Sequence, residues 1–447
     1  MPSAGAKKMK EQAVLVVAGH WLMLSVAINI GLLLKVVRDG NLPIDWSGSG
    51  FHINGNENGA TLSSLSSYAA EPKPDDQILE KYINLDHGDP TMYQSYWKQI
   101  GDRTTVVISG WQSVSYFSDP KNLCWFLEPG FANAVTRLHN IVGNAETGNR
   151  HIVVGTGSTQ LFQAVLYALC PYDAPEPMSI VSAAPFYSSY PLITDCLKSG
   201  LYKWRGDAND FDKDEPYIEL VTSPNNPDGS IREAMFNGSG RILVHDVAYY
   251  WPQYTPISSR ADHDIMLFTL SKSTGHAGMR LGWALVKDEA IAKKMVKFIE
   301  ISSIGVSKDS QVRAAKILDV ISDIYEDAET SNESKRFFDY AYEEMAKRWS
   351  QLREAVSKGQ AFSLPTLPVG KCNFSNRTFG TQPAFAWVKC EQADYCESFL
   401  KKHKILTRGG EHFGSSKKYV RASLIGHEED YNEFIRRLSL INSEESP

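Results

Sequence analysis

The feature that most constrains the fold is an alternation of short β-branched runs with helical segments, which begins near residue 150. Polar or glycine-rich stretches follow these runs. This alternation is typical of α/β folds with a parallel sheet, in which ligands bind beyond the carboxyl ends of the strands. The expected strands are residues 152–154, 179–182, 218–221, 242–244 and 265–268.

Five polar motifs lie near the ends of these expected strands. Each alone has an ordinary structural interpretation, such as a glycine-rich turn, a strand-end cap or a core aromatic. Their occurrence together, in this order, favours a single functional site. The motifs are Gly-Thr-Gly-Ser-Thr-Gln at 155–160, Ala-Pro-Phe-Tyr-Ser-Ser-Tyr at 184–190, Asn-Pro-Asp-Gly at 226–229, Asp-Val-Ala-Tyr at 246–249, and residues 269–283 with Lys272 and Arg280.

Together these motifs supply what pyridoxal 5'-phosphate requires of a protein. Lys272 can hold the cofactor aldehyde as a Schiff base and can also move a proton. Asp246 can pair with the protonated pyridine nitrogen, because a buried carboxylate favours a cationic partner. Asn226 and Tyr249 can donate hydrogen bonds to the ring oxygen O3'.

The phosphate of such a cofactor needs backbone N–H groups at a helix start and a fixed cation. Gly157, Ser158 and Thr159 offer the first, and Arg280 offers the second. Tyr187 stands where an aromatic ring could stack on the pyridine face. The motifs therefore predict a complete site for pyridoxal phosphate.

Longer stretches of the chain resemble the plant alliinase/tryptophan aminotransferase-related family, within the fold type I (aspartate aminotransferase-like) pyridoxal-phosphate enzymes. The resemblance covers roughly residues 80 to 440. It implies an α/β fold with a large cofactor-binding domain and a smaller C-terminal α+β domain. The stretches that carry it are 84–93, 109–117, 124–128, 221–229 and 245–254.

The resemblance also implies roles for residues outside the five motifs. In such homodimers a tyrosine of one subunit reaches the phosphate bound by the other, and Tyr116 stands at that position. Arg421 matches a C-terminal arginine that grips the substrate carboxylate as a bidentate fork, with Gly88 near the same carboxylate. The hydroxyl groups implied at the phosphate are those of Ser158, Thr159 and Ser271 (or Thr269).

By the same resemblance, the chain is expected to convert L-tryptophan and a 2-oxo acid such as pyruvate to indole-3-pyruvate and alanine, the first step of auxin formation through indole-3-pyruvate. A C–S lyase acting on S-alkyl-cysteine sulfoxides is the alternative, because it uses the same lysine chemistry. The first cysteine is Cys124, so the cysteine-rich segment of storage alliinases is missing, which favours the aminotransferase. A catalytically silent, membrane-tethered binding protein is a third hypothesis, disfavoured by the intact Lys272, Asp246, Asn226 and Arg280.

Composition points to a small-molecule enzyme. The 447 residues are 43% hydrophobic and carry a formal net charge of −6. A net negative charge does not favour binding to the negatively charged backbone of a nucleic acid. The six cysteines lack metal-ligand spacing, and we expect no metal. Cys390 and Cys396 lie only six positions apart, and we favour buried thiols throughout, although an even number also permits disulfides.

Residues 13–34 contain no Asp, Glu, Lys or Arg, and about 20 apolar residues suffice to cross a bilayer. We expect a retained single-pass anchor over 13–37, in the endoplasmic reticulum, with a cleavable signal ending near Ala27 as the alternative. Lysines on both sides leave the orientation open.

The remaining boundaries follow from composition. Residues 1–12 form a short basic N-terminus, and residues 38–78, rich in Gly, Ser, Asn and Pro, are expected to be a flexible linker. The large domain with an N-terminal arm is placed at 79–325 and the small domain at 326–447. A long amphipathic helix is expected over 337–355.

Overall fold

The computed structural model describes residues 81–211, 215–234, 240–326 and 335–444. The anchor expected over 13–37 and the linker expected over 38–78 lie outside these residues. Among the helices that are described, none combines the length and the apolar character that a bilayer span requires. The described residues belong to one compact unit.

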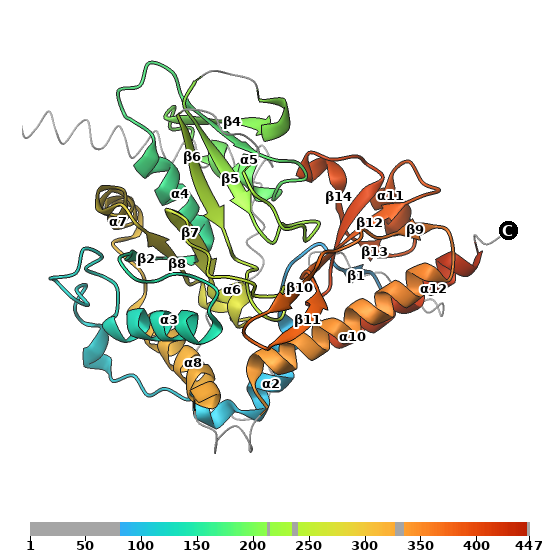
Figure 1. Ribbon diagram of the computed structural model, residues 1–447, viewed down its shortest axis with the longest axis horizontal. Helices are drawn as coiled ribbons and strands as arrows, with labels where there is room; N and C mark the ends of the chain where they lie inside the picture. The colour runs from blue at the N-terminus through green and yellow to red at the C-terminus, as the bar shows by residue number, and fades with distance from the viewer. Residues whose placement is uncertain (1–80, 212–214, 235–239, 327–334, 445–447) are drawn as a thin grey trace, which may run out of the picture. The chain divides into compact units, whose positions relative to one another are not determined.

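A seven-stranded sheet forms the centre of the larger part of this unit (Figure 1). Its order is β2-β8-β7-β6-β5-β3-β4, and β8 alone runs antiparallel to its neighbours. The strands are β2 (His151–Gly155), β3 (Met178–Ser182), β4 (Tyr202–Asp207), β5 (Tyr217–Thr222), β6 (Arg241–Asp246), β7 (Ile265–Thr269) and β8 (Gly282–Val286).

All five expected strands are confirmed, whereas β4 and β8 were not expected. Neither of these two contains a run of β-branched residues, the signal on which the prediction depended. Strand β4 reads Tyr-Lys-Trp-Arg-Gly-Asp and lies at the edge of the sheet, where alternating polar residues are tolerated. Strand β8 is buried along its whole length but begins with glycine and contains only one β-branched residue.

Helices flank this sheet, and α4 packs on β2, β7 and β8 while α3 lies along α8 (Figure 1). The α-helices here are α2 (Gln94–Gln99), α3 (Pro129–Val142), α4 (Gly157–Leu169), α5 (Ser189–Cys196), α6 (Leu270–Ser273), α7 (Glu289–Ser303) and α8 (Lys308–Glu326). Short 3-10 helices are η1 (Thr91–Tyr93), η2 (Gly101–Thr104), η3 (Gly110–Ser113), η4 (Ala208–Asp210), η5 (Ala277–Met279) and, further along the chain, η6 (Gly410–Phe413).

A buried polar group is built into the core where α3 meets the sheet. His139 accepts a hydrogen bond at Nε2 from the Trp283 indole (3.0 Å), so its Nδ1 is left to donate to the Asn144 side-chain oxygen (2.8 Å). Burial lowers the pKa of His139 to about 4, which keeps the ring neutral near pH 7. Fully buried, this histidine is therefore satisfied on both sides.

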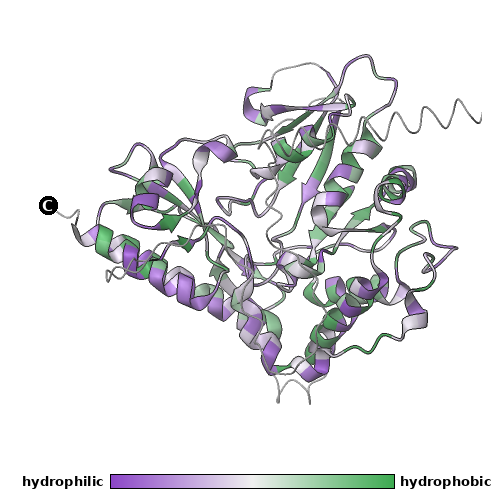
Figure 2. Ribbon diagram, turned by 180° about the vertical axis from the view of Figure 1, so that it is seen from behind, coloured by the Kyte–Doolittle hydropathy of each residue, from purple (hydrophilic) through white to green (hydrophobic). Residues whose placement is uncertain are grey.

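A four-stranded antiparallel sheet, in the order β14-β15-β12-β9, forms the C-terminal part. The long helix expected over 337–355 is confirmed as α10 (Phe337–Ser357), which packs beside α12, and both carry hydrophobic and hydrophilic bands (Figure 2). The other elements are β9 (Phe362–Ser363), β10 (Val369–Cys372), β11 (Arg377–Gly380), β12 (Phe385–Cys390), α11 (Cys396–Lys402), β13 (Ile405–Leu406), β14 (Arg408–Gly409), β15 (Tyr419–Ser423) and α12 (Glu428–Glu444).

The N-terminal arm joins the C-terminal part rather than the large sheet. Strand β1 (Ile83–Asn84) pairs in parallel with β13, so that Ile83 lies opposite Ile405. Beyond β1 the arm turns toward the large domain, where the carbonyl of Gly88 meets Lys272. The arm therefore touches both halves of the unit.

The preference for free thiols is wrong at one pair of cysteines. Cys390, at the end of β12, and Cys396, at the start of α11, form a disulfide with their Cα atoms 5.4 Å apart. The turn between β12 and α11 brings the two residues together, which sequence separation alone does not reveal. The other four cysteines are free, with Cys124, Cys170 and Cys372 buried as expected and Cys196 exposed.

Candidate active site

Lys272 belongs to the short helix α6. This helix follows directly on the carboxyl end of β7 (Figure 1). The Nζ of Lys272 donates a hydrogen bond to the Gly88 carbonyl (2.6 Å) and lies 5.9 Å from the centre of the Tyr249 ring. Burial, and then the positive charge of Arg421, lower the pKa of Lys272 to about 7. A lysine with such a pKa can act as a nucleophile and as a base near neutral pH.

Asp246 is the last residue of β6, and its side chain is held by two donors. The Tyr190 hydroxyl donates to one carboxylate oxygen (2.9 Å), and the Ala248 amide donates to the other (3.1 Å). Burial raises the pKa of Asp246, although both hydrogen bonds act in the opposite direction. A buried carboxylate of this kind favours a cationic partner such as a protonated ring nitrogen.

Asn226 and Tyr249 are brought together as the sequence predicted. The Asn226 amide donates to the Tyr249 hydroxyl (3.2 Å), while its side-chain oxygen accepts from Arg421 (3.1 Å). Burial, and then the nearby Tyr187 hydroxyl, raise the pKa of Tyr249 well above its ordinary value. The Tyr249 hydroxyl therefore remains protonated and able to donate a hydrogen bond.

The start of α4 forms a second corner of the site. Gly157, Ser158 and Thr159 make up the first turn, whose backbone N–H groups have no partner inside the helix. A side-chain carbon at Gly157 would lie 2.8 Å from a terminal nitrogen of Arg280, so the absence of a side chain leaves room for the guanidinium. Backbone donors and a cation at one helix start are suited to a phosphate.

Two hydroxyl residues, Thr269 and Ser271, lie in the turn that carries Lys272. Both are buried, and the Thr269 hydroxyl accepts from the Ser271 amide (3.3 Å) and donates to the Ser271 hydroxyl (3.2 Å). Thr269 is thereby the N-cap residue of α6. This capping bond fixes the position of Lys272 three residues later.

Arg421 enters from β15 of the C-terminal sheet and is only 3% exposed. It donates to Asn226 and to the carbonyl of Asp86 (2.6 Å), and its guanidinium lies 4.1 Å from the centre of the Phe385 ring. Burial lowers the pKa of Arg421 to about 10, so it stays charged at neutral pH. Its Nε has no partner among the described residues, which leaves one donor to offer.

Gly88 lies where these groups converge. A side-chain carbon there would lie 2.6 Å from the Phe385 ring and 3.0 Å from the Lys272 amine. Only glycine fits at this position, and its carbonyl consequently reaches Lys272. The structure thus brings together Gly88, Lys272 and Arg421, which lie far apart in the sequence.

Two further predicted site residues, Tyr187 and Tyr116, have roles that stay predictions. Tyr187 is partly buried against the Tyr190 ring, with centroids 5.3 Å apart, and its hydroxyl influences the pKa of Tyr249. Tyr116 is 69% exposed. This exposure leaves Tyr116 available to a neighbouring molecule, which is the role the sequence predicted for it.

Sequence reasoning gave no role to Tyr190, Asp86, Arg408 or Phe385. Tyr190 lies in the motif at 184–190, and Asp86 lies in the stretch 84–93 that carried the family resemblance, so a signal existed for both but no function was attached to it. Arg408 and Phe385 lie in no motif. They are found only because β12, β14 and β15 bring them beside Arg421.

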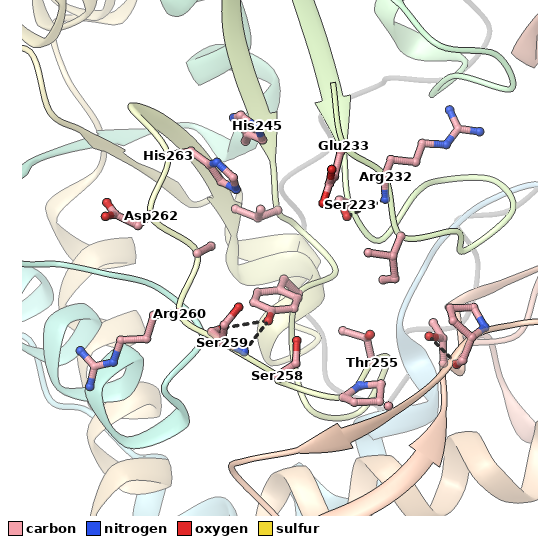
Figure 3. Close-up of a pocket in the computed structure, with 18 of the residues that line it drawn as sticks. Ser223, Arg232, Glu233, His245, Thr255, Ser258, Ser259, Arg260, Asp262 and His263 are labelled. Carbon is pink, nitrogen blue, oxygen red and sulfur yellow. Dashed lines mark hydrogen bonds between the residues drawn. The ribbon is translucent and has the colours of Figure 1, made fainter. Parts of the chain in front are cut away.

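A separate pocket of about 490 Å³ lies on the other side of β6 (Figure 3). Neighbouring residues of a strand point to opposite faces, so His245 lines this pocket while Asp246 faces the Lys272 cluster. The ring of His245 stacks on that of His263, with centroids 3.5 Å apart. Neither Lys272 nor Arg421 lines this pocket, so it is distinct from the candidate active site.

Known proteins are similar to this chain in sequence, and solved structures are similar to it in fold. The Alliinase_C family, described as allinase, matches residues 83–442. Tryptophan aminotransferase-related protein 2 of Arabidopsis thaliana is 52% identical, over 94% of this chain and 96% of the relative. An alliin lyase of Allium cepa var. aggregatum is 35% identical, over 79% and 80%. An aminotransferase structure from Staphylococcus aureus has a TM-score of 0.55 at 19% identity, over 83% of this chain and 97% of that one.

The fold and the lysine-centred site define a member of the pyridoxal-phosphate-dependent fold type I superfamily. Within that superfamily the chain belongs to the alliinase family, which also contains the tryptophan aminotransferase-related proteins. The families concerned depend on pyridoxal phosphate, which agrees with the arrangement of groups around Lys272.

Proposed function

We propose that this protein is an aminotransferase that converts L-tryptophan and pyruvate to indole-3-pyruvate and alanine. The observation that carries the proposal is one cluster of three buried groups. It consists of the Lys272 amine, whose pKa is lowered to about 7, the Arg421 cation and the Asp246 carboxylate. The relatives at 52–55% identity, all named tryptophan aminotransferase-related proteins, support the choice of donor.

The residues present fit pyridoxal 5'-phosphate. Lys272 would hold it covalently, Asp246 would pair with its ring nitrogen, and the Asn226 and Tyr249 pair would bind its ring oxygen. The space left by Gly157 beside Arg280 would receive the phosphate. When bound, the group supplies an electron sink for the bond broken at the substrate Cα. The remaining phosphate contacts would come from Ser158, Thr159, Thr269 and Ser271.

The chain's own residues orient the substrate and move its proton. A substrate carboxylate would replace the Asn226 oxygen and the Asp86 carbonyl on Arg421, since a carboxylate is the better acceptor for a guanidinium. The Lys272 amine, with a pKa of about 7, can take a proton from Cα and return it to a neighbouring atom. Burial of both residues excludes water from this transfer.

A C–S lyase acting on S-alkyl-cysteine sulfoxides is the second candidate. One observation favours it: the chain matches the family model described as allinase, and an alliin lyase of Allium cepa var. aggregatum is 35% identical. The same amine can serve elimination from Cβ as well as transamination. The lower identity to the lyases makes the aminotransferase the preferred proposal.

Product identification separates the two candidates. We would incubate the full-length protein, purified in mild detergent with cofactor, with L-tryptophan and pyruvate, and separately with an S-alkyl-cysteine sulfoxide. We expect indole-3-pyruvate and alanine from the first mixture and little pyruvate from the second. The Lys272→Ala variant is the matched control and should form no product. Pyruvate and ammonia from the sulfoxide alone would instead assign the protein to the lyases.

A further inference from the structure

Two arginines lie side by side at the proposed carboxylate site. Arg408 and Arg421 are direct partners in the antiparallel pair β14–β15, so their Cα atoms are about 5 Å apart and their side chains share one face. Such a pair of cations could receive the two carboxylates of a dicarboxylic substrate. Whether it does depends on what neutralises Arg408.

Asp86 accepts hydrogen bonds from both arginines. Its carboxylate forms a two-point ion pair with Arg408, from Nε to Oδ1 (2.6 Å) and from a terminal nitrogen to Oδ2 (2.9 Å). Its backbone carbonyl accepts the bond from Arg421. Burial acts to raise the pKa of Asp86, but Arg408 outweighs it, and the pKa is lowered overall. Asp86 is therefore ionised, and Arg408 is neutralised.

The pair is held in place rather than free to open. The remaining terminal nitrogen of Arg408 donates to the Ser188 hydroxyl (3.1 Å), next to Tyr187. The arm that carries Asp86 is fixed by the β1–β13 pairing and by a bond from the Ser423 amide to the Leu85 carbonyl (2.8 Å). All three guanidinium nitrogens of Arg408 therefore already have hydrogen-bond partners when a substrate arrives.

We propose that the Asp86–Arg408 ion pair restricts this site to monocarboxylic substrates. This rests on the proposed function in placing the α-carboxylate on Arg421. A second carboxylate would have to displace Asp86 from Arg408 and would meet its negative charge. L-Tryptophan, pyruvate and alanine carry one carboxylate each, whereas glutamate and 2-oxoglutarate carry two. Asp86 and Arg408 are thus specificity-determining residues that exclude the dicarboxylic class.

The test is the binding of two unreactive acids, glutarate and its monoacid counterpart valerate, to the full-length protein with cofactor, by titration calorimetry. Asp86→Asn removes the charge and keeps the shape and the backbone carbonyl. We expect the ratio of glutarate to valerate affinity to rise about tenfold in this variant. The double variant Asp86→Asn/Arg408→Met should lose that rise. An unchanged ratio in Asp86→Asn, or a rise that persists without Arg408, overturns the proposal.

Arg408→Gln gives an independent measurement should Asp86→Asn fail to fold. It leaves the Asp86 carboxylate without its partner beside Arg421, so valerate binding should weaken about tenfold. Unchanged valerate binding in this variant contradicts the proposal. Arg421→Ala reports on the proposed function instead, because it should abolish valerate binding in every background. Retained binding there would overturn the substrate site itself, and the two failures are thereby distinguished.

Discussion

The amine of Lys272 donates to the Gly88 carbonyl and shares its surroundings with Arg421. Burial and this neighbouring positive charge both disfavour the ammonium form, which is why the pKa falls to about 7. An ordinary exposed lysine has a pKa of about 10.4 and is almost wholly protonated at neutral pH. The environment of Lys272 therefore makes it the reactive amine in the cofactor-free protein.

The covalent uptake of pyridoxal phosphate by the cofactor-free protein should follow this pKa. Because only the neutral amine attacks an aldehyde, the uptake rate should rise about tenfold per pH unit below 7 and level off above it. Stopped-flow absorbance from pH 5 to 9 would measure the rate. Lys293→Ala, at an exposed lysine, is the control and should keep the profile. A midpoint near pH 10 would contradict the lowered pKa.

The residues of the site divide by how they could be found. Lys272, Asp246, Asn226 and Tyr249 could be predicted because each lies in a short motif at a strand end, and the strands deliver them to one place. Tyr190 could not be assigned, since its bond to Asp246 spans 56 residues and depends on how α5 packs. Contacts between distant residues leave no local pattern in a single sequence.

At the scale of elements, the start of α4 shows how a missing side chain creates a site. Gly157 has a φ of +76°, a backbone conformation that residues with a side chain rarely adopt, and Arg280 occupies the space beside it. Both facts require glycine at this position, for the backbone conformation and for the approach of the guanidinium.

Gly157→Ala should therefore weaken cofactor binding about tenfold and destabilise the fold by about 1 kcal/mol, through strain at a positive φ. Fluorescence titration with pyridoxal phosphate and urea unfolding would measure the two effects. Gly278→Ala is the matched control, because a side-chain carbon there meets nothing within 4 Å. Equal effects of the two substitutions would remove the special role of Gly157.

His139 of α3, which is neutral and bonded to Trp283 of β8, predicts that the stability of the fold falls in acid. Its folded pKa of about 4 lies below the unfolded value of 6.5, so between these pH values only the unfolded state binds the proton. The free energy of unfolding should consequently fall by roughly 3 kcal/mol as the pH drops from 6.5 to 4. His245 and His276, whose pKa values are also lowered mainly by burial, should act in the same direction.

His139→Gln should reduce this pH dependence, because a glutamine can accept from Trp283 and donate to Asn144 without taking up a proton. Urea unfolding at pH 4.5 and 7 would compare the variant with the parent protein. His412→Gln, at an exposed histidine, should leave the dependence as it is. If His139→Gln loses as much stability on acidification as the parent does, the histidine is not the cause.

At the scale of the whole molecule, the alternation of strands and helices predicted the α/β class correctly, and an amphipathic pattern predicted the long helix α10. Neither pattern could predict that the arm joins the C-terminal part, because β1 has only two residues and its partner lies some 320 positions away. The disulfide was missed for a related reason, since it depends on the turn that follows β12. Local patterns specify elements, and pairing between distant segments specifies how they assemble.

The segment 105–117 exposes apolar side chains although it is held in place on α8. Trp111 is 77% exposed and Val114 is 81% exposed, yet the Lys308 amine donates to the Phe117 carbonyl (2.7 Å). An ordered apolar surface of this kind marks an interaction site. Tyr116 lies within it, and we propose that a second copy of the chain covers this surface and thereby receives Tyr116 at its phosphate site.

Trp111→Asp should then convert a dimer to a monomer, because burying a carboxylate at an apolar interface costs several kcal/mol. It should also weaken pyridoxal phosphate binding, since Tyr116 of the neighbouring copy is withdrawn with the interface. Light scattering of the full-length protein in mild detergent gives the mass, and fluorescence titration gives the affinity. Tyr172→Asp, at a residue 90% exposed elsewhere, is the control. A Trp111→Asp protein that stays dimeric would exclude this segment as the interface, and a monomer with full affinity would exclude Tyr116 from the phosphate.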